Sequence, residues 1–269
     1  MRLKTILKTA FFFFLAGGSS HAQTASPTAP RVSSHQSIVV SADLTPEEKE
    51  EGRLNDLYQP LYQLEMQHSC TNAIEKYRSI ISEAQKSKFD RPRNKFIYMA
   101  TRGIAGCDIS SGNYEEAEAL YQKCLDYGPG LSDSSYPIIL SSIGVARLGQ
   151  QNWKGAEEIL QKSVVVFDQQ IESAIHSDSE FMRTEHANNL RMSQDSVLNY
   201  LAAAYFRQDR SAEALDTLER AYTQATKFNA PAPVLNSIIE SGRAIAISNV
   251  NLPASATWLL RAKSENQKK

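Results

Sequence analysis

The feature that most constrains how this chain can fold is a recurring pair, a small side chain followed four positions later by a bulky one. In a helix these two positions lie on the same face, one turn apart. The small residue lets a neighbouring helix come close, and the bulky residue fills the space beside it. The pair occurs at Ala117 and Tyr121, at Ala156 and Leu160, and at Ala214 and Leu218, with weaker copies at Ala73 and Tyr77 and at Ser255 and Leu259.

A second small residue precedes each strong copy by twelve positions. Together these residues resemble the tetratricopeptide repeat (TPR), and the resemblance covers about residues 46–265. It implies antiparallel helix pairs, with the earlier small residue on the first helix and the alanine and its bulky partner on the second. The resemblance predicts an all-α, right-handed α-solenoid of about five antiparallel pairs. The residues expected to pack the repeats together are Ala105, Ala117, Tyr121, Gly144, Ala156, Leu160, Ala202, Ala214, Leu218 and Ala221.

The copies are spaced more widely than the 34 residues of a standard TPR. Successive anchors at Ala73, Ala117, Ala156, Ala214 and Ser255 stand 44, 39, 58 and 41 positions apart. We therefore expect helices that are longer than usual for this family.

The widest gap predicts a long helical hairpin. An apolar stripe continues at helical spacing from Leu160 to Ile175 and stops at Ser177-Asp178-Ser179-Glu180, which favours a turn and a capping box. Two helices that overrun here would project from the stack. The projection is either a contact element for a partner or an elongated structural hairpin.

Residues 1–22 are typical of an export signal, because basic residues precede an apolar run and small residues stand at Ser20 and Ala22. We expect cleavage after Ala22 and a periplasmic or secreted protein without membrane insertion; the alternative is an uncleaved anchor. Residues 23–44 are rich in Ser, Ala, Pro and Thr and predict a flexible leader, in which residues 38–40 could dock as an extended segment. The repeat domain spans 45–265, and a frayed tail follows at 266–269.

Order is expected to begin at Thr45, where Pro46 suits the first helical position and Glu48 completes a capping box. Pro60 falls inside the first helix of the first pair. Since proline removes a backbone donor there, we expect a kink or a helix that restarts near Leu61.

The balance of 29 basic and 30 acidic residues argues against nucleic-acid binding, which needs clustered positive charge. No P-loop, G-x-S-x-G or HExxH motif occurs, so no catalytic, cofactor-binding or metal-binding residue is predicted. A surface metal site at His176 and His186 is a minor alternative. The pairs Glu115-Glu116 and Glu157-Glu158 are expected on the solvated face of their helices.

Three cysteines in an exported chain leave one without a partner. In stacked helix pairs the start of one second helix lies near the end of the next first helix, and Cys70 and Cys107 occupy these places. We therefore predict a disulfide between Cys70 and Cys107. Cys124 falls at a small, buried position of its helix and is expected to be an inert thiol.

Family resemblance implies that the first helices line a concave groove for a protein or peptide partner. Family members that grip a terminal carboxylate use lysine, asparagine and arginine; Gly106, Ser142, Ser196 and Tyr200 stand at four of those places, so only Arg102 fits. The candidate groove residues are Met99, Arg102, Ile109, Ile138, Ser141, Val145, Leu148, Asn199, Ala203, Phe206 and Arg207.

These observations predict a non-enzymatic interaction scaffold or adaptor of the cell envelope. One alternative is an envelope assembly or secretion factor that holds a client protein. A more remote one is a hydrolase built on helical repeats. The sequence leaves open the identity of the partner, the oligomeric state, and whether the groove, the outer face or the long hairpin makes the contact.

Overall fold

The computed structural model describes residues 44–66, 70–127 and 135–266. All regular structure in these ranges is helical, and consecutive helices form five pairs, as the repeat pattern predicts. Residues 1–43 lie outside the described part, so the expected signal, leader and docking segment at 38–40 are not placed. The pairs are α2 (Pro46–Met66) with α3 (Cys70–Gln85), α4 (Asp90–Ser111) with α5 (Tyr114–Asp126), α6 (Ser135–Gly149) with α7 (Trp153–Ile175), α8 (Ala187–Arg207) with α9 (Ser211–Lys227), and α10 (Ala232–Ser248) with α11 (Pro253–Asn266).

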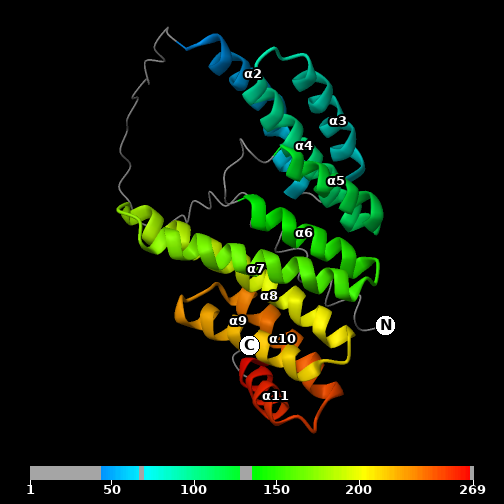
Figure 1. The fold of residues 1–269 in the computed structure, drawn as a ribbon, viewed down its shortest axis with the longest axis vertical. Coiled ribbons are helices and arrows are strands. Elements are labelled where there is room, and N and C mark those ends of the chain that lie inside the picture. The colour runs from blue at the N-terminus through cyan, green and yellow to red at the C-terminus, as the bar shows by residue number, and fades with distance from the viewer. Residues whose placement is uncertain (1–43, 67–69, 128–134, 267–269) are drawn as a thin grey trace.

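The five pairs stack one on the next along the long axis of the molecule (Figure 1). Each second helix packs against its own first helix and against the first helix of the following pair. Among the first helices, α2 contacts α4, α6 contacts α8, and α8 contacts α10. First helices of neighbouring pairs contact one another more often than second helices do. The first helices therefore form the inner side of the stack and the second helices the outer side.

The hydrophobic core runs through the whole stack. One cluster of buried side chains joins α2, α3 and α4, and a larger one extends from α4 to α11; Met99, Leu120 and Tyr127 pack against both. All ten residues expected to pack the repeats together are buried. Their small side chains therefore lie at the helix–helix contacts that the sequence pattern implies.

The closest contacts place a glycine of a first helix against a bulky side chain of a second helix. A Cβ built on Gly144 of α6 would lie 2.5 Å from Cγ of Leu160 on α7, which is closer than packed atoms approach. A Cβ on Gly103 of α4 would likewise overlap the Tyr77 ring of α3. These glycines are needed because no larger residue fits at this distance between helices.

The first helix begins where its capping box predicts. The backbone N–H of Thr45 donates to Oε2 of Glu48 at 2.7 Å, and the backbone N–H of Glu48 donates to Oγ1 of Thr45 at 3.2 Å. These reciprocal bonds satisfy two donors that an isolated helix end leaves unpaired.

Pro60 does not interrupt α2, so the expectation of a helix that restarts near Leu61 was wrong. The helix runs unbroken from Pro46 to Met66 with Pro60 inside it. Leu54 and Leu61 stand seven positions apart on either side of the proline and are both fully buried. Packing on both sides of Pro60 therefore holds the helix together despite one missing hydrogen bond.

The long hairpin is formed by α7 and the beginning of α8, and α7 extends beyond the neighbouring pairs (Figure 1). The turn between them is closed by Arg183, whose Nη1 donates to the carbonyl oxygens of Ser177 at 2.7 Å and Asp178 at 2.8 Å. A single π-helical turn, Met182–His186, follows before α8. The sequence pattern does not predict this π-turn. An apolar stripe shows which face of a helix is buried, but it does not show which backbone groups are hydrogen-bonded to each other.

The three cysteines form no disulfide in the structure, so the predicted bond between Cys70 and Cys107 is not confirmed. Cys70 begins α3 at the edge of the smaller core cluster, whereas Cys107 is buried within it. Cys124 is 1 % exposed, and this burial raises the pKa of its thiol to about 12. Its surroundings fit the inert core thiol expected from the sequence.

Replacing Gly242 by alanine should destabilise the fold, because a Cβ at this position would overlap the buried Trp258 ring. We expect a loss of about 1–3 kcal/mol in the free energy of unfolding, measured by urea denaturation. Gly52→Ala is the matched control, since nothing lies within 4 Å of a Cβ added at this exposed position of α2. It should raise stability by up to about 1 kcal/mol through helix propensity. Equal effects of the two substitutions would contradict the packing explanation.

Candidate functional site

The structure buries much of the groove predicted from the sequence. Among the eleven candidate residues, Ile109, Ser141, Val145, Leu148 and Asn199 are buried, and only Arg207 is well exposed. The remaining ones, which are partly buried, are Met99, Arg102, Ile138, Ala203 and Phe206.

These five buried residues lack the exposed side-chain surface that contact with a partner needs. Each inner helix packs against the second helix of its own pair and of the preceding one, and most also contact a neighbouring first helix. Asn199 shows the consequence: its Nδ2 donates to Oγ of Ser237 on α10 at 3.1 Å. Asn199 therefore connects two inner helices.

Arg102 is the candidate residue with the most distinctive surroundings. It is partly buried on α4, and it faces the hydroxyl groups of Tyr98, Tyr58 and Tyr121. Its Cζ lies 5.8 Å from the centre of the Tyr98 ring. No carboxylate of the described residues forms an ion pair with Arg102. We call Arg102 and these three tyrosines the Arg102 cluster.

Tyr121 of this cluster supplies no negative charge near neutral pH. Burial raises the pKa of Tyr121 well above its usual value, and a hydrogen bond with Ser142 of α6 only partly opposes this. The Tyr98 hydroxyl is buried and interacts with the Arg102 guanidinium. Arg102 and Tyr98 stand four positions apart on α4, so the cluster presents a cation beside a tyrosine hydroxyl.

The sequence pattern identified Arg102 and Tyr121 but for separate reasons, as a groove residue and as a packing residue. Tyr98 was missed, although its position one helical turn before Arg102 places both on the same face. Tyr58 could not be linked to the cluster from sequence, because it belongs to α2 and meets Arg102 only through helix stacking.

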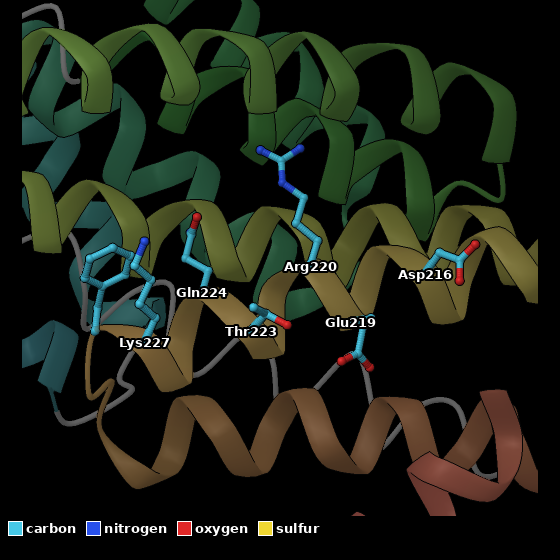
Figure 2. A pocket seen from close by; sticks show the side chains of 7 residues that line it. Asp216, Glu219, Arg220, Thr223, Gln224 and Lys227 are labelled. Atoms are coloured by element: carbon cyan, nitrogen blue, oxygen red, sulfur yellow. The ribbon is translucent and has the colours of Figure 1, made fainter.

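A different open pocket of about 420 Å³ lies along the outer helix α9 (Figure 2). All seven residues that line it belong to this helix or to Phe228 directly after it. Phe228 is contacted by two cations, with Cζ of Arg191 at 3.8 Å and Nζ of Lys227 at 5.3 Å from the ring centre. The pocket is therefore a feature of an exposed helix face.

Two glutamates that follow an anchor alanine join neighbouring pairs. Oε1 of Glu118 on α5 accepts from Nε of Arg147 at 2.8 Å, and its Oε2 accepts from Gln150 at 2.8 Å. In the next repeat, Oε2 of Glu157 accepts from Gln208 at 2.8 Å and from Arg210 at 2.7 Å.

Glu157 was expected on a solvated face, and this expectation was wrong, because the side chain is only 13 % exposed. Its position directly after the anchor Ala156 could have indicated that Glu157 lies at the contact between repeats. Glu118 and Glu157 each directly follow an anchor alanine, and each meets an arginine and a glutamine from the end of the next first helix or the turn after it. A repeated polar position beside a packing position is a sign of an interface between repeats.

A buried polar network joins α7, α8 and α9. Asp195 is 1 % exposed, and its Oδ1 accepts from Nε2 of Gln224 at 2.9 Å. Gln224 also donates to Gln194, which in turn donates to Asp168 at 2.7 Å, and Asp168 pairs with Arg220 at 2.7 Å and 2.9 Å. Burial raises the pKa of Asp195 to about 8, against the partial effect of the Gln224 hydrogen bond.

Metal binding and membrane insertion find no support in the described ranges. No group of three or more His, Cys, Asp or Glu side chains there could hold a metal ion. No helix there combines the length and apolar character needed to cross a bilayer. Nδ1 of His176 instead lies 3.3 Å from Oε1 of Glu172, which stands one turn earlier on α7.

Comparison with known proteins supports the fold. No protein-family model and no curated protein sequence matches the chain. A crystal structure of nearly identical TPR-like repeats from a putative kinesin light chain of Podosopora anserina matches with a TM-score of 0.58 and 16 % identity, over 82 % of this chain and 99 % of that one. A second structure of these repeats has a TM-score of 0.56 and 15 % identity, over 81 % of this chain and 97 % of that one. The chain therefore has the fold of a TPR-like α-solenoid.

Asp195→Asn should change how stability depends on pH. Because the folded pKa of about 8 exceeds the unfolded value, the native state holds a proton that the unfolded chain has lost between about pH 4 and pH 8. The stability of the unmodified protein should therefore fall as pH rises through this window, by up to about 1.4 kcal/mol per pH unit from this group. Asparagine keeps an oxygen for Gln224 and removes the titration.

Denaturation at several pH values tests this expectation. Relative to the unmodified protein, the Asp195→Asn variant should gain stability steadily from pH 4 to pH 8. Asp126→Asn, at an exposed position on α5, is the control. Parallel stability curves for Asp195→Asn and the unmodified protein would show that the buried carboxyl does not titrate as described.

Proposed function

We propose that this protein is a non-enzymatic interaction scaffold of the cell envelope that binds an acidic segment of a partner protein at the Arg102 cluster. One observation carries the proposal. A partly buried guanidinium that forms no ion pair with a carboxylate of the described residues lies among three tyrosines.

The physical reason is that the guanidinium gives up hydration without an opposite charge among the described residues to replace it. Withdrawing a charge from water is unfavourable unless an opposite charge and hydrogen bonds compensate it. A carboxylate offers two acceptor oxygens to the guanidinium and can also accept a hydrogen bond from Tyr98. An aspartate, a glutamate or a chain terminus of a partner supplies this group.

The scaffold role follows from the architecture. Stacked helix pairs give a long continuous surface, and each pair buries its apolar face only against its neighbours. The likeness to TPR-like repeats adds support by analogy of fold. The cell-envelope part of the proposal rests on residues 1–22, whose basic, apolar and small segments follow the order of an export signal.

Peptide selection followed by substitution of Arg102 tests the proposed function. Peptides selected from a random library on the mature chain should be enriched in Asp and Glu. Arg102→Gln should weaken their binding by roughly 10- to 100-fold, the size of a lost charge-assisted hydrogen bond. Fluorescence anisotropy with a selected peptide measures the change.

Arg78→Gln is the matched control, because Arg78 is an exposed arginine on the outer helix α3 and should leave peptide affinity unchanged. Tyr98→Phe should give a smaller loss than Arg102→Gln, since it removes one neutral donor. Selected peptides without acidic residues, or equal losses for Arg102→Gln and Arg78→Gln, would contradict the proposal.

A further inference from the structure

The exposed face of α9 carries a regular stripe of four polar side chains. Asp216, Arg220, Thr223 and Lys227 are all exposed and follow one side of the helix (Figure 2). Their spacing of four, three and four positions is that of a helix face that packs along a second helix. The stripe covers eleven residue steps, which is about 16 Å of helix.

The two end charges of the stripe are available, whereas the charges in its middle are engaged. Arg220 is held by Asp168 of α7 at 2.7 Å, and the neighbouring Glu219 by Arg261 of α11 at 2.7 Å. Asp216 and Lys227 form no ion pair with any residue that the structure describes. An acid therefore stands at the beginning of the stripe and a base at its end, neither of them in an ion pair with a described residue, and the Lys227 ammonium lies over the Phe228 ring.

The stripe begins with an acid and ends with a base, so two antiparallel copies of it have complementary charges. If two copies of the stripe lie antiparallel about a two-fold axis between positions 221 and 222, Asp216 of each copy faces Lys227 of the other. In the same register Arg220 of one copy faces Thr223 of the other. The small threonine leaves room for Arg220, which stays paired with Asp168 of its own chain. A parallel arrangement would instead place like charges together at three of the four positions, so the pattern selects one orientation.

We infer that the α9 stripe is the contact surface of a two-fold symmetric dimer of this chain, in which α9 packs antiparallel against α9 of a second copy. The contact is polar and short, so the dimer is weak and forms at micromolar or higher concentration, at the low end of specific interfaces.

Charge substitutions at the two ends test the dimer in sedimentation experiments on the mature chain at about 50 mM salt. Asp216→Lys alone and Lys227→Asp alone should each weaken dimerisation by about tenfold or more, because each substitution turns two symmetry-related attractions into repulsions. The double variant Asp216→Lys with Lys227→Asp should return to within about threefold of the unmodified affinity, since the pairs are restored in exchanged order.

A mixture of the two single variants should form a heterodimer, in which one copy carries only bases and the other only acids at the stripe ends. Glu116→Lys, an exposed change on the outer helix α5, is the control and should leave the dimer unchanged. A chain that stays monomeric up to about 1 mM overturns the inference. So does a double variant that remains as weak as the single ones. Peptide binding at Arg102 is unaffected in either case, because it belongs to the inner face.

Discussion

The whole fold depends on the close approach between first and second helices, which small residues make possible. Gly144 against Leu160, Gly103 against Tyr77 and Gly242 against Trp258 are contacts in which even a methyl group on the glycine would overlap its neighbour. Gly144 and Gly242 bring the two helices of one pair together, whereas Gly103 brings α4 against α3 of the preceding pair. Because a helix pair cannot bury its apolar face alone, both kinds of contact are needed for one continuous core. Inner and outer faces exist only as a consequence of this stacking.

Polar contacts fix how one pair is placed against the next. Glu118 and Glu157 each bind an arginine and a glutamine from the end of the following first helix or the turn after it, at equivalent places beside the anchor alanine. Apolar packing alone tolerates sliding of one helix past another, whereas a partly buried carboxylate left without its donors costs free energy. These repeated contacts therefore favour a single register. The same physics underlies the proposal for Arg102, which has no carboxylate partner among the described residues.

The sequence could predict the parts of the fold that depend on local periodicity. Spacing of small and bulky residues gave the helix pairs and their number, and the Thr45 capping box gave the first helix boundary. Features set by contacts between distant segments could not be predicted. Pro60 is tolerated because Leu54 and Leu61 are buried on both sides of it, and Glu157 is shielded by residues about fifty positions away.

The candidate site was predicted only in part for the same reason. Family resemblance assigned the groove to the first helices, yet it could not show that Ile109, Val145 and Leu148 are buried. Burial there depends on how closely neighbouring pairs stack, which a single helix does not record. Arg102 was identified from its position, but its tyrosine surroundings became evident only in three dimensions.

The most direct measurement of the central claim is a double-mutant cycle between Gly144 and Leu160, with unfolding free energies from urea denaturation. Gly144→Ala in the unmodified chain introduces a methyl group against Leu160 and should destabilise the fold. In a Leu160→Ala background the obstructing atoms are gone, so the same change should be neutral or stabilising by up to about 1 kcal/mol. Equal destabilisation by Gly144→Ala in both backgrounds would show that close approach of these two helices does not govern the fold.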